Sequence, residues 1–232
     1  LINNMVLGVK EGYEKRLEIV GVGYGGVDSY DVHALETIQC MVERRKGGEK
    51  GVKWLQAYRG EKFWQAHHDR VWSHELFEAA LCRSHTLKPA RDGFNHIFPT
   101  IDEFKQIVTD PIAYTYEHTD GLRCTMILMN SLIEDFNFAA RLKGQEAPLS
   151  TQMYLPMPPA RSSLANFFSP QVNNVEQMFL TGKPTYPLER TLLTTGLTAA
   201  GVDSLHKDQI RLETPHLNIT YPAPETSTFW RY

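Results

Sequence analysis

The sequence has few cysteines, no long apolar run and no excess of positive charge, and each absence excludes a class of protein. The three cysteines, Cys40, Cys82 and Cys124, are odd in number and far apart, which fits neither a disulfide framework nor a CxxC metal site. We therefore expect a reducing, cytoplasmic environment. No apolar stretch approaches the roughly 20 residues of a membrane helix, so we expect no membrane partner. The net charge of −3 leaves no basic footprint for nucleic acid.

The sequence does have the composition of an ordinary globular protein. It holds 232 residues, 42% hydrophobic and 22% charged, which is enough to bury a substantial core. We expect residues 16–222 to form one domain, with an excursion from the main fold at about 84–111. Residues 1–15 would be a linker or the end of a missing upstream domain, since the chain starts on Leu1 without a signal-peptide pattern. Residues 223–232 would form a tail.

Residues 16–46 organise the prediction, because they combine a strand, a glycine turn and a helix. An apolar run predicts the strand, and apolar residues at near-helical spacing predict the helix. Between the two, three glycines are spaced as G-x-G-x-x-G: Gly21, Gly23 and Gly26. This spacing is typical of a dinucleotide-binding turn, but it also suits tight packing and a sharp turn. Because Asp28 and Asp31 would repel phosphates, we favour packing and expect this chain alone to bind no dinucleotide.

The second half of the chain alternates apolar and polar residues, as strands do when one face is buried. GLRCTMILMNS, DFNFAARLKG and STQMYLP show this period of two, which favours an antiparallel sheet. Two helices, 171–181 and 188–206, should pack on one face. The other face keeps Ile127, Met129 and Tyr154, an apolar patch that would be free or paired in a homo-oligomer. We therefore expect an α+β fold, a mostly antiparallel open-faced sheet with helices packed on one face.

The region before this sheet predicts a hairpin and a short helix. VKWLQAYRGEKFWQAHH indicates two strands around a tight turn at residues 59–61, and Ser73 can cap a helix in HELFEAALCR. His67 and His68 suggest a metal site, but adjacent side chains of a strand point to opposite faces, so we predict none. The nearby tryptophans, including Trp72, could form a sugar-stacking platform, although core or interface packing explains them more simply.

His33 is the residue on which a functional interpretation depends. It stands one turn into the expected helix, just after a polar group that includes Asp28, Ser29 and Asp31. A catalytic histidine exchanges a proton near neutral pH and needs a partner to fix its tautomer, which Asp28, Asp31 or Glu36 could supply. A histidine in a first helical turn can equally be a hydrogen-bonded structural residue.

The order of these elements resembles the C-terminal domain of the glucose–fructose oxidoreductase / inositol dehydrogenase (Gfo/Idh/MocA) family, as found in bacteria. The resemblance covers residues 18–212 and rests on GGVDSYDVHALETIQCMVE, EHTDGLRCTMILMNS, ARLKGQEAPL and VEQMFLTGKPTYPLERTLLTTGLTAAGVDSLHKD. In that family a glycine pair precedes an Asp-x-x-x-His segment that opens a helix. Here Gly25, Gly26 and His33 match, and Ser29 stands at the position of the Asp.

The resemblance implies the substrate-binding half of an NAD(P)-dependent oxidoreductase that acts on a sugar or polyol. NAD or NADP would be bound mainly by a Rossmann domain absent from this chain, so the chain alone would be inactive. The expected catalytic residues are His33, Asp28 and Asp31. The expected substrate-binding residues are Ser29, Tyr30, Glu36 and Trp72. The alternative, favoured by Ser29, is a non-catalytic relative that acts as a binding or self-associating scaffold module.

Overall fold

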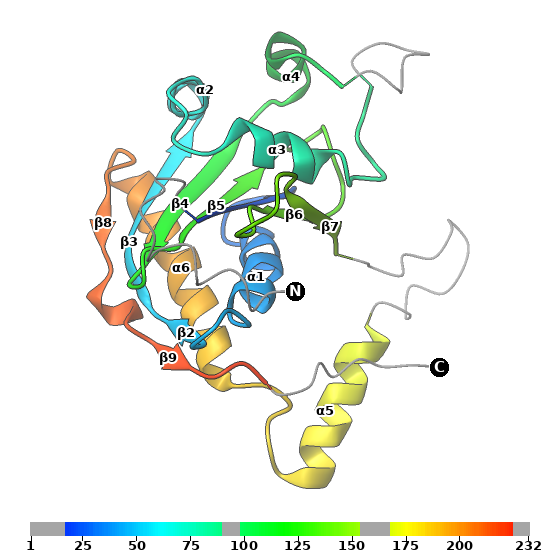
Figure 1. Ribbon diagram of the computed structural model, residues 1–232, viewed down its shortest axis with the longest axis vertical. Coiled ribbons are helices and arrows are strands. Elements are labelled where there is room, and N and C mark those ends of the chain that lie inside the picture. The colour runs from blue at the N-terminus through cyan, green and yellow to red at the C-terminus, as the bar shows by residue number, and fades with distance from the viewer. Residues whose placement is uncertain (1–16, 90–97, 154–167, 225–232) are drawn as a thin grey trace.

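The computed structural model describes residues 17–89, 98–153 and 168–224, which form an α+β fold on one seven-stranded sheet (Figure 1). The strand order is β7-β6-β1-β5-β4-β3-β8. Within this sheet the neighbours β1 and β5 run parallel, and the other described pairs run antiparallel. The strands are β1 (Glu18–Gly23), β3 (Val52–Arg59), β4 (Ile112–His118), β5 (Arg123–Leu128), β6 (Asn137–Ala140), β7 (Leu149–Gln152) and β8 (Leu212–Glu213).

Helices cover both faces of the sheet, so the fold has three layers (Figure 1). On one face lie α1 (Asp31–Val42) and α6 (Leu188–His206). On the other face lie α2 (Glu61–His68), α3 (His74–Leu81) and α4 (Ile101–Ile107). Each helical layer closes an apolar core of its own against the sheet. The expected α+β class and mostly antiparallel sheet are confirmed, but the placement of helices on one face only is wrong.

The glycines of β1 let α1 approach the sheet closely. A Cβ added at Gly21 would lie 2.6 Å from a side-chain carbon of Ile38, and one added at Gly23 would lie 2.5 Å from Phe136. Real Cβ atoms do not come so close, so neither position accepts a side chain without a shift of its neighbours. Val20 and Val22, which alternate with these glycines along β1, belong to the core on the opposite face. The two-residue period of β1 therefore serves both layers.

The face that was expected to be open is buried. Ile127 and Met129 are fully buried and belong to the same core as Phe77 of α3 and Phe104 of α4. The predicted apolar patch is therefore wrong for these residues, because α2, α3 and α4 supply a helical layer above them. Tyr154, the third member of the predicted patch, lies outside the described residues. Homo-oligomer formation stays a prediction, but this face does not support it.

The predicted hairpin after β3 is also wrong. β3 ends at Arg59, and Gly60, with a φ of 62°, turns the chain into α2 instead of a second strand. Phe63, Ala66 and His67 are the buried residues of α2. Their i, i+3, i+4 spacing is that of a helix with one buried face. Sequence alone left strand and helix hard to separate, because this helix spans only eight residues.

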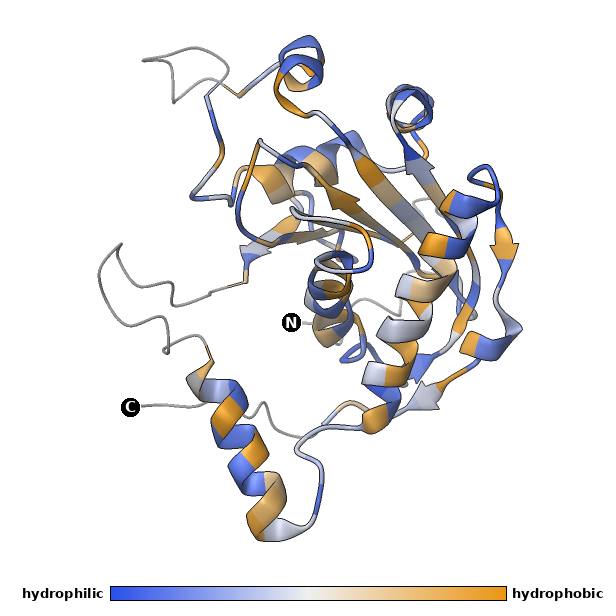
Figure 2. Ribbon diagram, turned by 180° about the vertical axis from the view of Figure 1, so that it is seen from behind, coloured by the Kyte–Doolittle hydropathy of each residue, from blue (hydrophilic) through white to orange (hydrophobic). Residues whose placement is uncertain are grey.

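The two helices of the C-terminal half behave differently. α6 has the predicted bounds and buries Leu193 and Leu197 completely against the sheet. α5 (Ser169–Thr181) stands apart from the sheet, and its apolar residues alternate with polar ones around the helix (Figure 2). Phe179 is 81% exposed, so the prediction that this helix packs on the same face of the sheet as α6 is wrong. No helix of the described residues is both long and apolar enough to cross a membrane.

Candidate functional site

The turn between β1 and α1 lies where the two parallel strands end. β1 and β5 reach their carboxyl ends together, since Gly23 pairs with Leu128. Just beyond, the backbone N–H of Gly25 donates to the Asn130 side-chain oxygen at 2.5 Å, which ties the turn to the end of β5. Gly25 has a φ of 95°, a conformation that favours glycine. In open sheets with parallel strands, ligands bind beyond the carboxyl ends of those strands, so this turn is the first candidate site.

A buried carboxylate fixes the shape of the turn. Asp31 Oδ1 accepts the backbone N–H groups of Ser29 and Val32 at 3.2 and 3.0 Å, and Oδ2 accepts that of Asp28 at 3.0 Å. Oδ2 also accepts the Tyr114 hydroxyl from β4 at 3.1 Å. Burial and the neighbouring Asp31 raise the pKa of Tyr114 well above its usual value, so the phenol stays a donor. Asp31 is therefore committed to holding the turn, and Asp28 takes a left-handed φ of 57° within it.

His33 lies exposed at the edge of a group of four rings, which we call the aromatic cluster: Tyr24, Tyr30, His33 and Phe136. The His33 ring centroid lies 5.5 Å from that of Tyr30 and 5.9 Å from that of Phe136, both edge-on. Tyr24 lies 5.1 Å from Tyr30 and 5.2 Å from Phe136. Such separations and tilts are favourable for aromatic pairs. The cluster combines apolar ring faces with one imidazole.

Three acidic residues were predicted as partners of His33, and none of them is hydrogen-bonded to its ring: Asp28, Asp31 and Glu36. Among the described residues no carboxylate is hydrogen-bonded to the His33 ring. Both oxygens of Asp31 instead accept hydrogen bonds, from backbone N–H groups of the turn and from the Tyr114 hydroxyl. Glu36, one turn further along α1, accepts the Thr194 hydroxyl of α6 at 2.5 Å. Burial raises the pKa of Glu36. The turn thus brings His33 and Tyr30 together, while Asp31 and Glu36 support it from behind.

Two further predicted residues have different positions. Ser29 is exposed in the turn, and its hydroxyl donates to the Gly26 carbonyl at 3.0 Å. Trp72 is fully buried in the core of the second face, where its indole N–H donates to His67 Nδ1 at 3.1 Å. A side chain in that position cannot contact a substrate, so Trp72 is removed from the expected binding set. The alternative interpretation, that the tryptophan packs in the core, is the one that describes Trp72.

The sequence did not predict three residues of the site: Tyr24, Asn130 and Phe136. Tyr24 directly follows β1, and Asn130 follows β5 by two residues. Their placement after strand ends was a usable signal only if those two strands were parallel neighbours. The alternation of the chain pointed instead to an antiparallel sheet, so the strand ends were expected at opposite edges. Burial, with Tyr30, Glu134 and Asp135 nearby, raises the pKa of Tyr24 and keeps it protonated.

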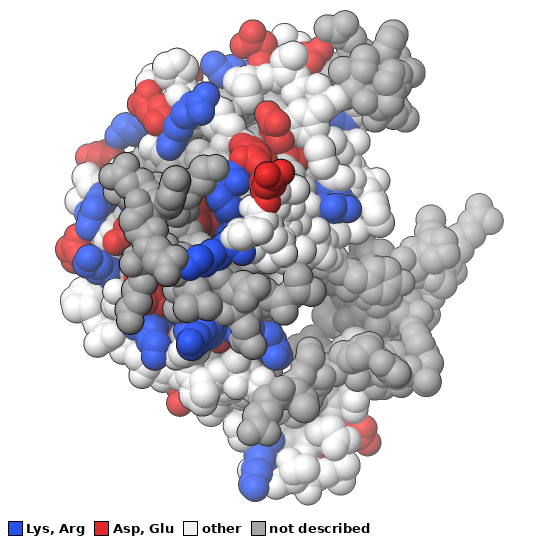
Figure 3. All heavy atoms as spheres, viewed as in Figure 1, with Lys and Arg blue, Asp and Glu red and all other residues white. Residues whose placement is uncertain are grey.

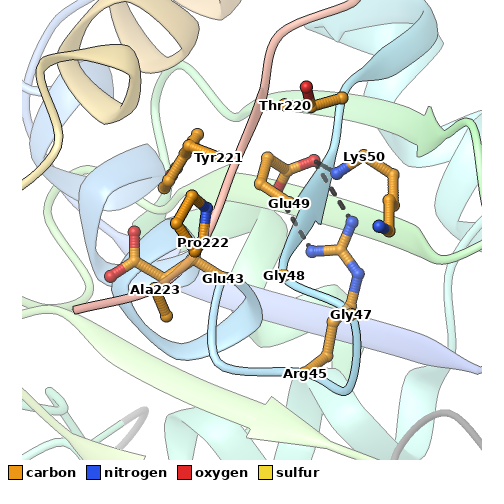
Figure 4. Close-up of a pocket in the computed structure, with 10 residues that line it drawn as sticks. All are labelled: Glu43, Arg45, Gly47, Gly48, Glu49, Lys50, Thr220, Tyr221, Pro222 and Ala223. Carbon is orange, nitrogen blue, oxygen red and sulfur yellow. Dashed lines mark hydrogen bonds and ion pairs between the residues drawn. The ribbon is translucent and has the colours of Figure 1, made fainter. Parts of the chain in front are cut away.

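A hollow lies elsewhere, between the end of α1 and the C-terminal strand β9 (Thr220–Tyr221), which pairs with β2 (Glu49–Lys50) (Figure 4). Its volume is about 450 Å³. It is lined by the turn after α1 and by the strand opposite: Glu43, Arg45, Gly47, Gly48, Glu49, Lys50, Thr220, Tyr221, Pro222 and Ala223. Four of these lining residues are charged.

The charges buried behind this hollow are already paired. Glu49 Oε2 contacts Arg45 at 3.0 Å and Oε1 contacts His118 Nδ1 at 2.8 Å, with all three side chains almost fully buried. Burial opposes the charged form of Glu49, but His118 and Arg45 outweigh it and hold the pKa of this carboxyl far below its usual range. Glu43 is ion-paired with Arg190 of α6. These groups tie α1, β2, β4 and α6 together, and their chemistry is structural.

Charge and metal-ligand placement add no further site. On the face shown in Figure 3, Lys and Arg side chains occur among Asp and Glu side chains. Within the part of the chain that the structure describes, no three His, Cys, Asp or Glu residues are grouped so as to hold a metal ion.

Comparison with known proteins does not assign the chain to a family. No protein-family profile matches it. A segment of 24 residues, 10% of this chain, is 71% identical to large ribosomal subunit protein uL6 of Listeria monocytogenes and 79% identical to that of Staphylococcus epidermidis. Each match spans 14% of the ribosomal protein, so most of both chains is outside it.

Among solved structures, the chain is similar to a myo-inositol dehydrogenase from Corynebacterium glutamicum. The TM-score is 0.42 and the sequence identity 13%, over 91% of this chain and 60% of that chain. A likeness of this degree does not carry an activity from one protein to the other. The function therefore has to be argued from the site.

Proposed function

We propose that this chain is the substrate-binding half of an NAD(P)-dependent oxidoreductase that acts on a sugar or polyol. The observation that carries the proposal is the aromatic cluster, with His33 exposed beside Tyr30 at the carboxyl ends of β1 and β5. Aromatic faces pack against the C–H groups of a sugar ring, and an imidazole can accept the proton of a hydroxyl that is being oxidised.

The other residues of the turn fix the position and orientation of the His33 ring. Asp31 fixes the backbone on which Tyr30 and His33 stand, and Asn130 holds the same turn from the other strand. Tyr30 and Phe136 contact the imidazole edge-on and limit the orientations of its ring. In the proposal, the hydroxyl proton of the bound polyol passes to a ring nitrogen of His33. Asp31 has no direct part in that transfer.

The glycine turn does not fit a dinucleotide. Gly21 and Gly23 are filled from behind by Ile38 and Phe136, and the Asp31 carboxylate already takes the N–H groups that a phosphate would need. NAD or NADP would therefore be bound by a separate nucleotide-binding domain, and we derive no hydride step for the residues of this chain. The prediction that the chain alone binds neither dinucleotide follows from the same contacts.

A second function, a non-catalytic binding or scaffold module, is favoured by one observation. A general acid–base is usually held by a hydrogen-bonded partner, and among the described residues no carboxylate is hydrogen-bonded to His33. The aromatic cluster could then bind the same class of ligand without reaction. The two functions share the ligand and differ only in turnover.

The test is polyol-dependent reduction of NAD or NADP by a protein that joins this chain to a nucleotide-binding domain. We expect Tyr30→Ala to raise KM about 2–10-fold, the worth of one aromatic contact. Tyr186→Ala is the matched control, since Tyr186 is 39% exposed against 41% for Tyr30 and lies outside the cluster. Binding of polyols without turnover would select the scaffold function. No binding across a panel of cyclic and acyclic polyols would reject both.

A further inference from the structure

Two histidines are stacked where α2 passes into α3. The ring centroids of His67 and His74 lie 4.0 Å apart, with planes 8° from parallel. Trp72, in the connection between the helices, donates its indole N–H to His67 Nδ1 at 3.1 Å. His74 Nε2 contacts the main-chain oxygen of His67. His67 is only 3% exposed, and the proposed function does not use any of these groups.

The contacts fix the protonation state of His67. An indole N–H can only donate, so His67 Nδ1 must accept and the neutral ring carries its proton on Nε2. Nε2 is buried and has no hydrogen-bond partner among the described residues. A second proton would have to go to Nδ1, where it would face the Trp72 N–H. Protonation of His67 therefore breaks the hydrogen bond to Trp72 and places a charge in the core.

No described carboxylate offsets such a charge. The groups whose charge acts on His67 are His74 from α3 and Lys105 from α4. At the end of α2, the exposed side chains of His68 and Asp69 contact each other. Phe77 of α3 packs edge-on against the ring at 5.3 Å. Burial, then His74, then Lys105 lower the pKa of His67 to about 4.

We propose that the His67–Trp72–His74 contact is an acid-sensitive latch, which holds α2 and α3 on the second face of the sheet while His67 is neutral. Protonation loosens these two helices and uncovers the core that they share with Val20 and Ile127. The opened segment binds the proton more readily, since an exposed histidine has a pKa of about 6.5. The free energy that this contact contributes to the closed form is therefore fully present above that pH and decreases as the pH falls toward 4.

The experiment is amide hydrogen exchange at pH 7 and pH 5, corrected for intrinsic exchange rates. We expect protection of α2 and α3 to fall about 20-fold, the ratio that follows from the two pKa values, while protection of β5 changes little. His67→Gln should remove the fall, because glutamine can accept from Trp72 but does not titrate. His68→Gln is the matched control and should keep it, since the His68 side chain is 84% exposed.

Two results would overturn the latch. One is an equal loss of protection in β5, which would mean general acid unfolding, and the other is an unchanged fall in His67→Gln. If His67→Gln does not fold, Trp72→Phe keeps a ring in place and removes the donor. Protection of α2 and α3 should then be lower at pH 7 and should fall less toward pH 5, because a proton on His67 Nδ1 no longer faces the indole N–H. A wild-type His67 that titrates near pH 6.5 by NMR would also reject the proposal.

Discussion

Replacement of His33 by asparagine is expected to lower turnover about 10²–10⁴-fold, the usual contribution of a general acid–base, with KM changed by less than about twofold. Asparagine keeps a polar side chain beside Tyr30 and Phe136 but cannot exchange a proton near neutral pH. Because His33 is exposed and no hydrogen bond of its ring to a described residue is lost, thermal stability should stay close to that of the wild type. Steady-state kinetics in a protein that carries the nucleotide-binding domain measures the rate.

The control for this substitution is His206→Asn. His206 is exposed at the end of α6, remote in sequence from the turn, and its replacement should leave both kinetic constants unchanged. A structural role for His33 predicts the opposite pattern, a lower melting temperature with little specific loss of rate. That pattern, or equal effects of His33→Asn and His206→Asn on turnover, would count against a proton transfer at His33.

Replacement of Glu49 by glutamine is expected to lower the free energy of unfolding by about 3–5 kcal/mol, the cost of breaking a buried ion pair by removal of one partner. Glutamine retains the shape but leaves the buried Arg45 guanidinium with Asp120 as its remaining described carboxylate, at 2.7 Å. It also leaves His118 without a charged partner at 2.8 Å. Urea denaturation followed by fluorescence gives the change.

Glu213→Gln provides the comparison. Glu213 pairs with Arg211 at 3.1 Å, but both side chains are about half exposed or more, so loss of the pair should cost less than about 1 kcal/mol. If Glu49→Gln costs no more than Glu213→Gln, the network around Glu49 is not what joins α1 to β2 and β4.

The sequence predicted those elements whose pattern is long and regular. The strand, turn and helix from Glu18 to Val42 and the 19-residue α6 follow from apolar periodicity, as do β5 and β6. α2 was missed because eight residues rich in aromatic and histidine side chains fit a strand and a helix alike. With α2 missed, nothing in the sequence indicated a layer over Ile127, so the second face was expected to be open.

The candidate site could be predicted only in part. The exposed turn with Tyr30 and His33 follows from local sequence, since the glycines and polar residues mark it. The role of Asp31 does not, because its partner Tyr114 is 83 residues away and lies on another strand. Likewise, Phe136 meets His33 only through the pairing of β6 with β1. Contacts of this range depend on the strand order, which periodicity leaves undetermined.

The most direct measurement of the central claim is an NMR titration of this chain with a panel of cyclic and acyclic polyols, followed at the ring protons of the aromatic cluster. The proposal predicts saturable shifts of Tyr24, Tyr30 and His33 for at least one polyol, with Tyr221 and His118 unmoved. Ring protons that stay unmoved across the whole panel, or shifts confined to the hollow around Glu49 and Tyr221, would contradict it.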